Sequence, residues 1–449
     1  MTSTLTAAPA AAGLRLSIMM FLQFFVWGAW YVTTGPYMEA HGLSNVIFWA
    51  YTVGPIAAII SPFFLGMVAD RFFASERVLG ALHILGGIGL LLAPRMANHH
   101  WEGAPTEGPF AFLREGPFIG CLLLHMLCYM PTLGLTNTVA FHAMRNPETQ
   151  FPLVRVWGTI GWIVAGLCVS WLGVDRGERV IEGLGSMALG QYHLGGAAAI
   201  VLGLYAFTLP HTPPPAKGKP FSARDALCLD ALALLKRPSF AVFIVCSLLV
   251  CIPLAAYYSY AGTFVGNQGV ANVGAVMSRG QMSEIFFMII MPVCFAGLGV
   301  KWMLAVGMLA WVVRYGLFWW AAGNAPADHG AALAWIIGDS HVALPIFLGI
   351  LLHGICYDFF FVTGFIHTER EAPKELRASA QGFLVLITQG LGMLIGAQAS
   401  GWLYGRSGAA SGGQHWQQFW LAPCLFALGV LVVFVLAFHH RERPKPTTA

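Results

Sequence analysis

Four ionisable side chains lie inside otherwise apolar segments of this 449-residue sequence. They are Arg155, Glu284, Arg314 and Asp358. Charged groups in an apolar environment are costly, so they usually mark a route for a polar solute or a proton. A guanidinium donates hydrogen bonds, a carboxylate accepts them, and a carboxylate can also take up a proton. These residue types therefore predict solute binding and proton transfer.

Asp358 is the best candidate for a proton-coupling group, because it lies well inside a long apolar run. A buried carboxylate needs either a proton or a nearby cation, which Arg155 or Arg314 could supply. Glu284 is the second candidate, and it shares a helix face with Gln281, three residues before it. Alternatively, Glu284 could lie near the membrane surface, where water would hydrate it. For Arg314 we favour a structural role as the partner of one acid.

Two further helix faces combine hydrogen-bonding groups with aromatic rings. Arg155, Thr159 and Trp162 are spaced by four and seven residues, which places them on one side of a helix. The arginine could instead pair with a loop at the end of its segment. In the first apolar segment, Gln23 and Trp27 could bind a ring-shaped solute, the ring by stacking and the amide by orienting it. The ordinary alternative for tryptophan is the membrane surface.

The composition indicates which elements position these side chains. Hydrophobic residues make up 57% of the chain and charged residues only 10%, whereas soluble domains carry roughly 25% charged residues. Apolar runs of about 20 residues, the length that spans a bilayer, recur along the chain. Such segments must be helical to satisfy their backbone groups. We expect spans near 15–37, 44–69, 78–95, 117–143, 153–175, 193–210, 239–265, 278–298, 301–322, 343–365, 377–404 and 416–439.

The polar stretch 211–238, which contains three consecutive prolines from Pro213, divides these spans into two sets of six. The fold class predicted is an all-α membrane protein with two six-helix bundles, the layout of the major facilitator superfamily. The expected domains are a disordered cytoplasmic N-terminus, an N-terminal bundle, a cytoplasmic linker, a C-terminal bundle and a cytoplasmic tail. Their boundaries are 1–13, 14–210, 211–238, 239–440 and 441–449.

Most lysine and arginine residues fall in the segments on the side of the N-terminus. This bias predicts that both termini are cytoplasmic and that the protein lies in the cell inner membrane. The net charge of +4 reflects loops beside anionic lipid and does not indicate nucleic-acid binding. The nine cysteines lack metal-ligand spacing. We therefore expect no metal and no cofactor. An intramembrane enzyme would require a nucleophile–base or metal pairing, so we also expect no enzymatic activity.

The loop after the second span contains Gly66, Asp70 and Arg71. This pattern resembles the glycine–aspartate–arginine signature of an inner loop in the major facilitator superfamily. The glycine allows a tight helix end, and the charges could pair across the bundle, which predicts a gating role. The alternative is a simple polar turn with solvated charges.

Short motifs along nearly the whole chain, in order, resemble the nucleoside:proton symporter family of that superfamily. They comprise Phe21–Phe24, Trp27–Gly28, Tyr37–Met38, Tyr129–Leu135, Arg155–Gly161, Gln281–Glu284, Asp358–Phe360 and Leu376–Gly382. The resemblance implies proton-driven import of nucleosides by alternating access. It also implies a central cavity lined by Arg155, Thr159, Gln281, Glu284 and Asp358. The expected partners are a nucleoside, protons and the lipid bilayer, and the expected state is a monomer.

Three departures from the family pattern leave the choice of substrate open. The seventh span, around Tyr258, lacks the usual glutamine and asparagine; Trp162 and Tyr357 replace phenylalanines; and two outer loops are longer. These changes predict a bulkier pocket with a different polarity. The alternative function is a carrier of the same fold for another small polar solute, such as a sugar or a modified nucleoside.

Overall fold

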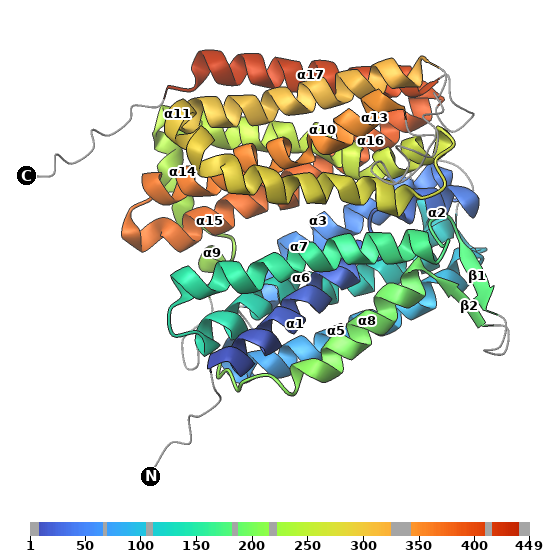
Figure 1. Ribbon diagram of the computed structural model, residues 1–449, viewed down its shortest axis with the longest axis horizontal. Helices are drawn as coiled ribbons and strands as arrows, with labels where there is room; N and C mark the ends of the chain where they lie inside the picture. The colour runs from blue at the N-terminus through green and yellow to red at the C-terminus, as the bar shows by residue number, and fades with distance from the viewer. Residues whose placement is uncertain are drawn as a thin grey trace, which may run out of the picture.

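The computed structural model describes residues 9–65, 70–104, 111–181, 187–214, 222–324, 343–408 and 415–439. The helices form two bundles that lie side by side (Figure 1). One bundle comes from the N-terminal half of the chain and the other from the C-terminal half. The helices of both bundles run in the same general direction, as expected for segments that cross a membrane together.

The N-terminal bundle is built from helices that follow one another closely in the sequence. The first span is bent, because α1 ends at Gly28 and a turn leads into α2. The long elements are α1 (Pro9–Gly28), α2 (Thr34–Ala40), α3 (Ile47–Phe64), α5 (Ser75–Ala97), α6 (Gly116–Ala143), α7 (Pro147–Trp171) and α8 (Gln191–Ala206). The short helical turns are η1 (Ser44–Val46), α4 (Asp70–Phe72) and η3 (Ala111–Glu115).

The C-terminal bundle follows α9 (Ala223–Ala226) and η4 (Leu229–Lys236). Two of its spans change from α-helix to π-helix and back, at η5 and η7. Its elements are α10 (Pro238–Asn267), α11 (Val273–Ala322), α13 (Leu344–Leu351), η5 (Ile355–Val362), α14 (Thr363–Glu371), η6 (Lys374–Leu376), α15 (Arg377–Val385), η7 (Leu386–Gly392), α16 (Met393–Ser407) and α17 (Trp416–Ala437).

The predicted twelve-span layout is confirmed. Among the described residues, nine helices are long and apolar enough to cross a membrane. One of these, α11, is two helices joined at Gly299, where φ is 67° and ψ is 178°. Glycine adopts this positive φ at little cost, so the chain reverses there between the predicted eighth and ninth spans. The shorter apolar helix α1 and the 16-residue helix α8 occupy the places of the predicted first and sixth spans.

The described residues also include one β-hairpin. β1 (Glu178–Ile181) pairs antiparallel with β2 (Met187–Gly190) in the loop between α7 and α8. The prediction of an all-α chain missed this hairpin because the loop has no apolar alternation that marks strands. The hairpin lies at one end of the molecule, which we call the hairpin side (Figure 1). Helix α1 begins and α17 ends at the opposite end, which we call the termini side.

Glycines let neighbouring helices approach until their backbones touch. A Cβ at Gly87 of α5 would lie 2.9 Å from the carbonyl oxygen of Gly196 in α8. A Cβ at Gly396 of α16 would lie 2.7 Å from the carbonyl oxygen of Ile252 in α10. Small residues at such contacts are typical of helix packing in membranes. Gly392, whose Cβ would lie 2.9 Å from the Leu248 carbonyl oxygen, faces α10 in the same way.

Gly87→Ala should destabilise the protein, because its new methyl group cannot be placed without moving the α8 backbone. Overpacking of this kind typically costs about 1–3 kcal/mol. Gly120→Ala is the matched control, since nothing lies within 4 Å of a Cβ at Gly120. Thermal unfolding in detergent should show a lower midpoint for Gly87→Ala only. Equal midpoints for both variants would contradict this packing.

Candidate functional site

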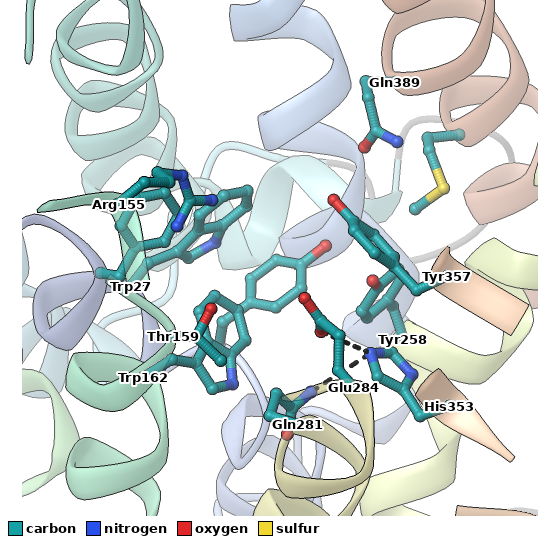
Figure 2. A pocket seen from close by; sticks show the side chains of 13 residues that line it. Trp27, Arg155, Thr159, Trp162, Tyr258, Gln281, Glu284, His353, Tyr357 and Gln389 are labelled. Atoms are coloured by element: carbon teal, nitrogen blue, oxygen red, sulfur yellow. Dashed lines mark hydrogen bonds and ion pairs between the residues drawn. The ribbon is translucent and has the colours of Figure 1, made fainter. Parts of the chain in front are cut away.

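A central pocket lies between the bundles, and both bundles contribute to its wall. Its N-terminal side comes from α1, the turn after it and α7, and its C-terminal side from α10, α11, the residues between α13 and η5, η5 itself, η7 and α16. Figure 2 shows these side chains converging on one space. The lining residues are Phe24, Trp27, Tyr31, Arg155, Thr159, Trp162, Tyr258, Gln281, Glu284, His353, Tyr357, Gln389 and Met393.

The N-terminal wall is aromatic with one cation. Trp27 and Trp162 meet edge to face with ring centroids 5.4 Å apart. The Arg155 guanidinium lies 4.1 Å from the centroid of the Phe24 ring, which stabilises the cation through the face of the ring. The predicted face of Arg155, Thr159 and Trp162 does line the pocket. A planar donor thus stands beside ring surfaces suited to stacking.

The C-terminal wall is more polar, and His353 lies at its centre. The Gln281 side-chain amide donates to His353 Nε2 over 3.4 Å. Glu284 Oε2 lies 3.9 Å from the same nitrogen (Figure 2). Gln281 Oε1 and His353 Nδ1 are buried without a hydrogen-bond partner among the described residues. A buried polar atom without a partner is costly, so this wall can gain stability by binding a polar solute.

One wall carries a basic side chain and the other an acidic one. Figure 2 shows Arg155 and Glu284 on different sides of the space, one from α7 and the other from α11. Neither bundle alone presents both a guanidinium and a carboxylate to this pocket. A solute with both acceptors and hydroxyl donors could therefore contact the two bundles at once.

A model of one protein family, described as Nucleoside H+ symporter, matches residues 11–443. The chain belongs to this family. A putative nucleoside transporter of Escherichia coli strain K12, YegT, is 35% identical over 97% of this chain and 95% of its own length. The nucleoside permease NupG of the same organism is 30% identical over 97% of each chain.

Solved structures confirm the predicted major facilitator fold. A crystal structure of the nucleoside transporter NupG aligns with a TM-score of 0.76 at 28% identity, covering 96% of this chain and all of that one. A crystal structure of a D-xylose–proton symporter aligns with a TM-score of 0.60 at 12% identity, covering 93% of this chain and 96% of that one. At that level of identity the likeness concerns the fold alone.

In this symporter chain Asp358 lies behind the pocket wall. Its side chain is fully buried, and neither carboxylate oxygen has a hydrogen-bond partner among the described residues. Asp358 is not among the lining residues, although Tyr357 next to it is. Both belong to the π-helical segment η5, and π-helical turns are frequent at functional sites. The segment thus places one side chain in the pocket and a carboxyl group just behind it.

Among the described residues Arg314 pairs with no acid, contrary to our expectation for a structural partner. It is fully buried, its Nε donates to the Gly349 carbonyl over 3.0 Å, and its guanidinium lies 4.2 Å from the Tyr257 ring centroid. Its two terminal nitrogens have no hydrogen-bond partner among the described residues. The ring and the carbonyl therefore take the place of the expected acid. These contacts keep Arg314 within the C-terminal bundle.

Gln23 lies inside the N-terminal bundle and not in the pocket. Its amide nitrogen donates to Thr132 Oγ1 over 2.8 Å, and its Oε1 lies 2.7 Å from His83 Nε2. The Tyr129 hydroxyl also donates to the Gln23 carbonyl over 2.7 Å. Gln23 therefore joins α1 to α5 and α6, and this placement gives it no contact with a solute in the pocket. Trp27, one turn further along α1, does reach the pocket.

Several lining residues were not predicted. Gln389 of η7 and Met393 of α16 lie in an apolar segment whose polar pair, Thr388 and Gln389, was the available signal. Phe24 and Tyr31 could not be separated from ordinary core aromatics by their spacing. A lone histidine in an apolar segment, such as His353, is likewise hard to distinguish from a packing residue by sequence.

The predicted gating motif is described only in part. Gly66 lies outside the described residues, and the side chain of Asp70 is not described. Arg71 lines a separate cavity on the termini side with residues of the linker, among them Asp225 and Cys228. The gating role of these three residues remains a prediction.

Gln23→Leu and Gln389→Leu should separate stability from binding. The first change leaves His83 and Thr132 without their buried partner, which typically costs about 1–3 kcal/mol. The second removes an amide that lines the pocket. We expect thermal unfolding at a lower temperature for Gln23→Leu, and weaker nucleoside binding at unchanged stability for Gln389→Leu. If Gln23→Leu instead weakened binding without a change in stability, the internal placement of Gln23 would be wrong.

Proposed function

We propose that this protein imports nucleosides together with protons, by alternating access of one central site. The observation that carries the proposal is the pocket in which Arg155 and Glu284 of opposite bundles face one space among aromatic rings. Membership of the Nucleoside H+ symporter family supports the same function. A site shared by two bundles is accessible from one side at a time when the bundles rock against each other.

We place the protein in the inner membrane of the cell with both termini in the cytoplasm. The positive-inside bias of the sequence supports this orientation. The basic residues Lys301 and Arg377 lie in elements that turn or begin on the termini side, and Arg237 directly precedes α10, which also begins there. The termini side is then cytoplasmic, and the hairpin side is the outer side.

The chemistry of the pocket suits the two parts of a nucleoside. Glu284 and Gln281 would accept hydrogen bonds from ribose hydroxyls, and His353 would position both. Trp27, Trp162 and the tyrosines would stack on the base, while Arg155 and Thr159 would donate to the ring nitrogens or carbonyl oxygens of the base. The pocket encloses about 120 Å³, whereas ligand sites usually hold about 300 Å³ or more. We therefore expect the walls to separate when a nucleoside enters.

Asp358 and Glu284 are the groups proposed to carry the proton. A buried carboxylate without a partner is strongly unfavourable, so a proton on Asp358 stabilises the closed packing around η5. Loss of that proton would favour a state in which water reaches the carboxylate. Coupling follows if the proton and the nucleoside favour the same state, because differential affinity is what shifts populations.

The proposal is tested by uptake of labelled adenosine and uridine into proteoliposomes with an inward proton gradient. We expect accumulation with the gradient and none after a protonophore collapses it. Asp358→Asn should abolish accumulation but retain exchange of internal for external nucleoside, because it removes proton coupling and not the pocket. Glu284→Gln should weaken both accumulation and exchange, because Glu284 is also proposed to contact the substrate.

Glu375→Gln, an exposed residue of η6, is the matched control and should transport normally. Full accumulation by Asp358→Asn would remove Asp358 from the mechanism. Uptake that does not respond to the protonophore would contradict symport itself. A competition panel with sugars and modified nucleosides against labelled adenosine would detect a different substrate class.

A further inference from the structure

A set of polar contacts joins the two bundles at the hairpin side, well away from the pocket. Asp175, in the loop after α7, accepts a hydrogen bond over 2.7 Å from the backbone N–H of Gly274. Ser170 of α7 donates to Asp175 Oδ1 over 2.7 Å and accepts from the backbone N–H of Ala275 over 2.8 Å. Asp175 is only 3% exposed and Ser170 only 8%. We call Ser170 and Asp175 the latch.

The latch caps a helix that belongs to the other bundle. Helix α11 begins at Val273, so the N–H groups of Gly274 and Ala275 lie in its first turn. Backbone N–H groups in the first turn of a helix have no acceptor within that helix and need an acceptor from elsewhere. The side chain at the N-cap position, Asn272, makes no capping bond. Ser170 and Asp175 provide the acceptors instead, and a carboxylate also suits the positive end of the helix dipole.

Glycines on both sides allow the bundles to come this close. A Cβ at Gly274 would lie 2.7 Å from the carbonyl oxygen of Gly166 in α7. A Cβ at Gly166 would overlap the hydroxyl of Ser278 in α11. Real Cβ atoms do not approach a carbonyl oxygen so closely, so any side chain at Gly274 must move the two helices apart. The latch therefore requires direct contact between the backbones of α7 and α11.

Other contacts between the bundles lie at the same side. Arg176 donates to the Gly266 carbonyl of α10, and the Asn267 amide donates to Glu39 over 3.0 Å. Gln398 of α16 donates to Thr52 of α3 over 2.8 Å. On the termini side, by contrast, the ion pairs of Glu371 with Arg237 and of Glu369 with Arg377 remain within one bundle. In Figure 1 the bundles likewise meet at the hairpin end, around α2.

We propose that Ser170 and Asp175 form the latch of the outer gate, capping α11 while the carrier faces inward and releasing it when the carrier opens outward. The assignment of this gate to the outer side of the membrane rests on the proposed function, whereas the hydrogen bonds of the latch do not. The same helix carries Gln281 and Glu284, the latter ten residues after Gly274 and about 15 Å further along the axis. Movement of the capped end of α11 therefore shifts the polar wall of the pocket.

The acceptor atom of Asp175 matters more to this latch than its charge. Burial raises the pKa of the Asp175 carboxyl, and the hydrogen bonds from Gly274 and Ser170 and the charge of Arg176 oppose that effect. An amide oxygen at position 175 can accept the same N–H without the cost of burying a charge. Asp175→Asn should therefore keep the latch, whereas Asp175→Ala should lose it.

Labelling of a pocket cysteine from outside tests the latch. Thr159→Cys places a thiol in the pocket, and a membrane-impermeant maleimide is added to right-side-out vesicles. The chain without Thr159→Cys measures the background of its nine native cysteines. We expect slow labelling of Thr159→Cys alone, severalfold faster labelling when Asp175→Ala, Ser170→Ala or Gly274→Ala is added, and a return to the slow rate with Asp175→Asn.

Glu102→Ala, an exposed acid near the hairpin side that lies outside the latch, is the matched control and should not change the rate. Thermal unfolding checks that each variant is folded. If one of the variants Asp175→Ala, Ser170→Ala and Gly274→Ala does not fold, the other two still test the latch. Unchanged labelling in the folded alanine variants, or fast labelling with Asp175→Asn, would overturn the latch. The assay contains no nucleoside and no proton gradient, so its outcome is independent of whether nucleoside symport is correct.

Discussion

Burying charge inside a membrane is the constraint on which this structure depends. Each charged side chain there must find a ring, a polar partner, a proton or water. Arg155 lies over Phe24, and Arg314 lies over Tyr257 with a carbonyl at its Nε. Glu284 faces the pocket, and Asp358 has no partner among the described residues. Gln281 and His353 in the pocket wall also carry a buried polar atom without a partner among the described residues, and a solute and a proton could satisfy the groups at the pocket.

The backbone supports this arrangement with local departures from the regular α-helix. The π-helical segments η5 and η7 lie in the two spans that place Tyr357 and Gln389 in the pocket. At the hairpin side, Gly166 and Gly274 allow α7 and α11 to touch. Helix α7 carries Arg155 and Thr159, and α11 carries Glu284. The helices that form the latch are thus the ones that carry the charged walls of the site, which links the gate to the pocket through rigid elements.

Hydropathy predicted the fold well, because a span needs only length and apolar composition. The boundary expected between the eighth and ninth spans coincides with the reversal at Gly299. Spacing also grouped Arg155 with Thr159 and Trp162 correctly on one face. Spacing does not show which neighbouring helix a face contacts. Gln23 was therefore expected beside Trp27 in the pocket, whereas it bonds to Thr132 inside the N-terminal bundle. Contacts between distant segments, such as Asp175 with Gly274, left no pattern in the sequence.

The central claim is that one nucleoside contacts both bundles in the pocket between Trp27, Arg155 and Glu284. A structure of the purified protein determined with adenosine tests this claim most directly. The account predicts density for the base against the aromatic rings of α1 and α7, and density for the ribose within hydrogen-bonding distance of Gln281 or Glu284. Adenosine bound elsewhere, or in contact with side chains of one bundle only, would contradict it.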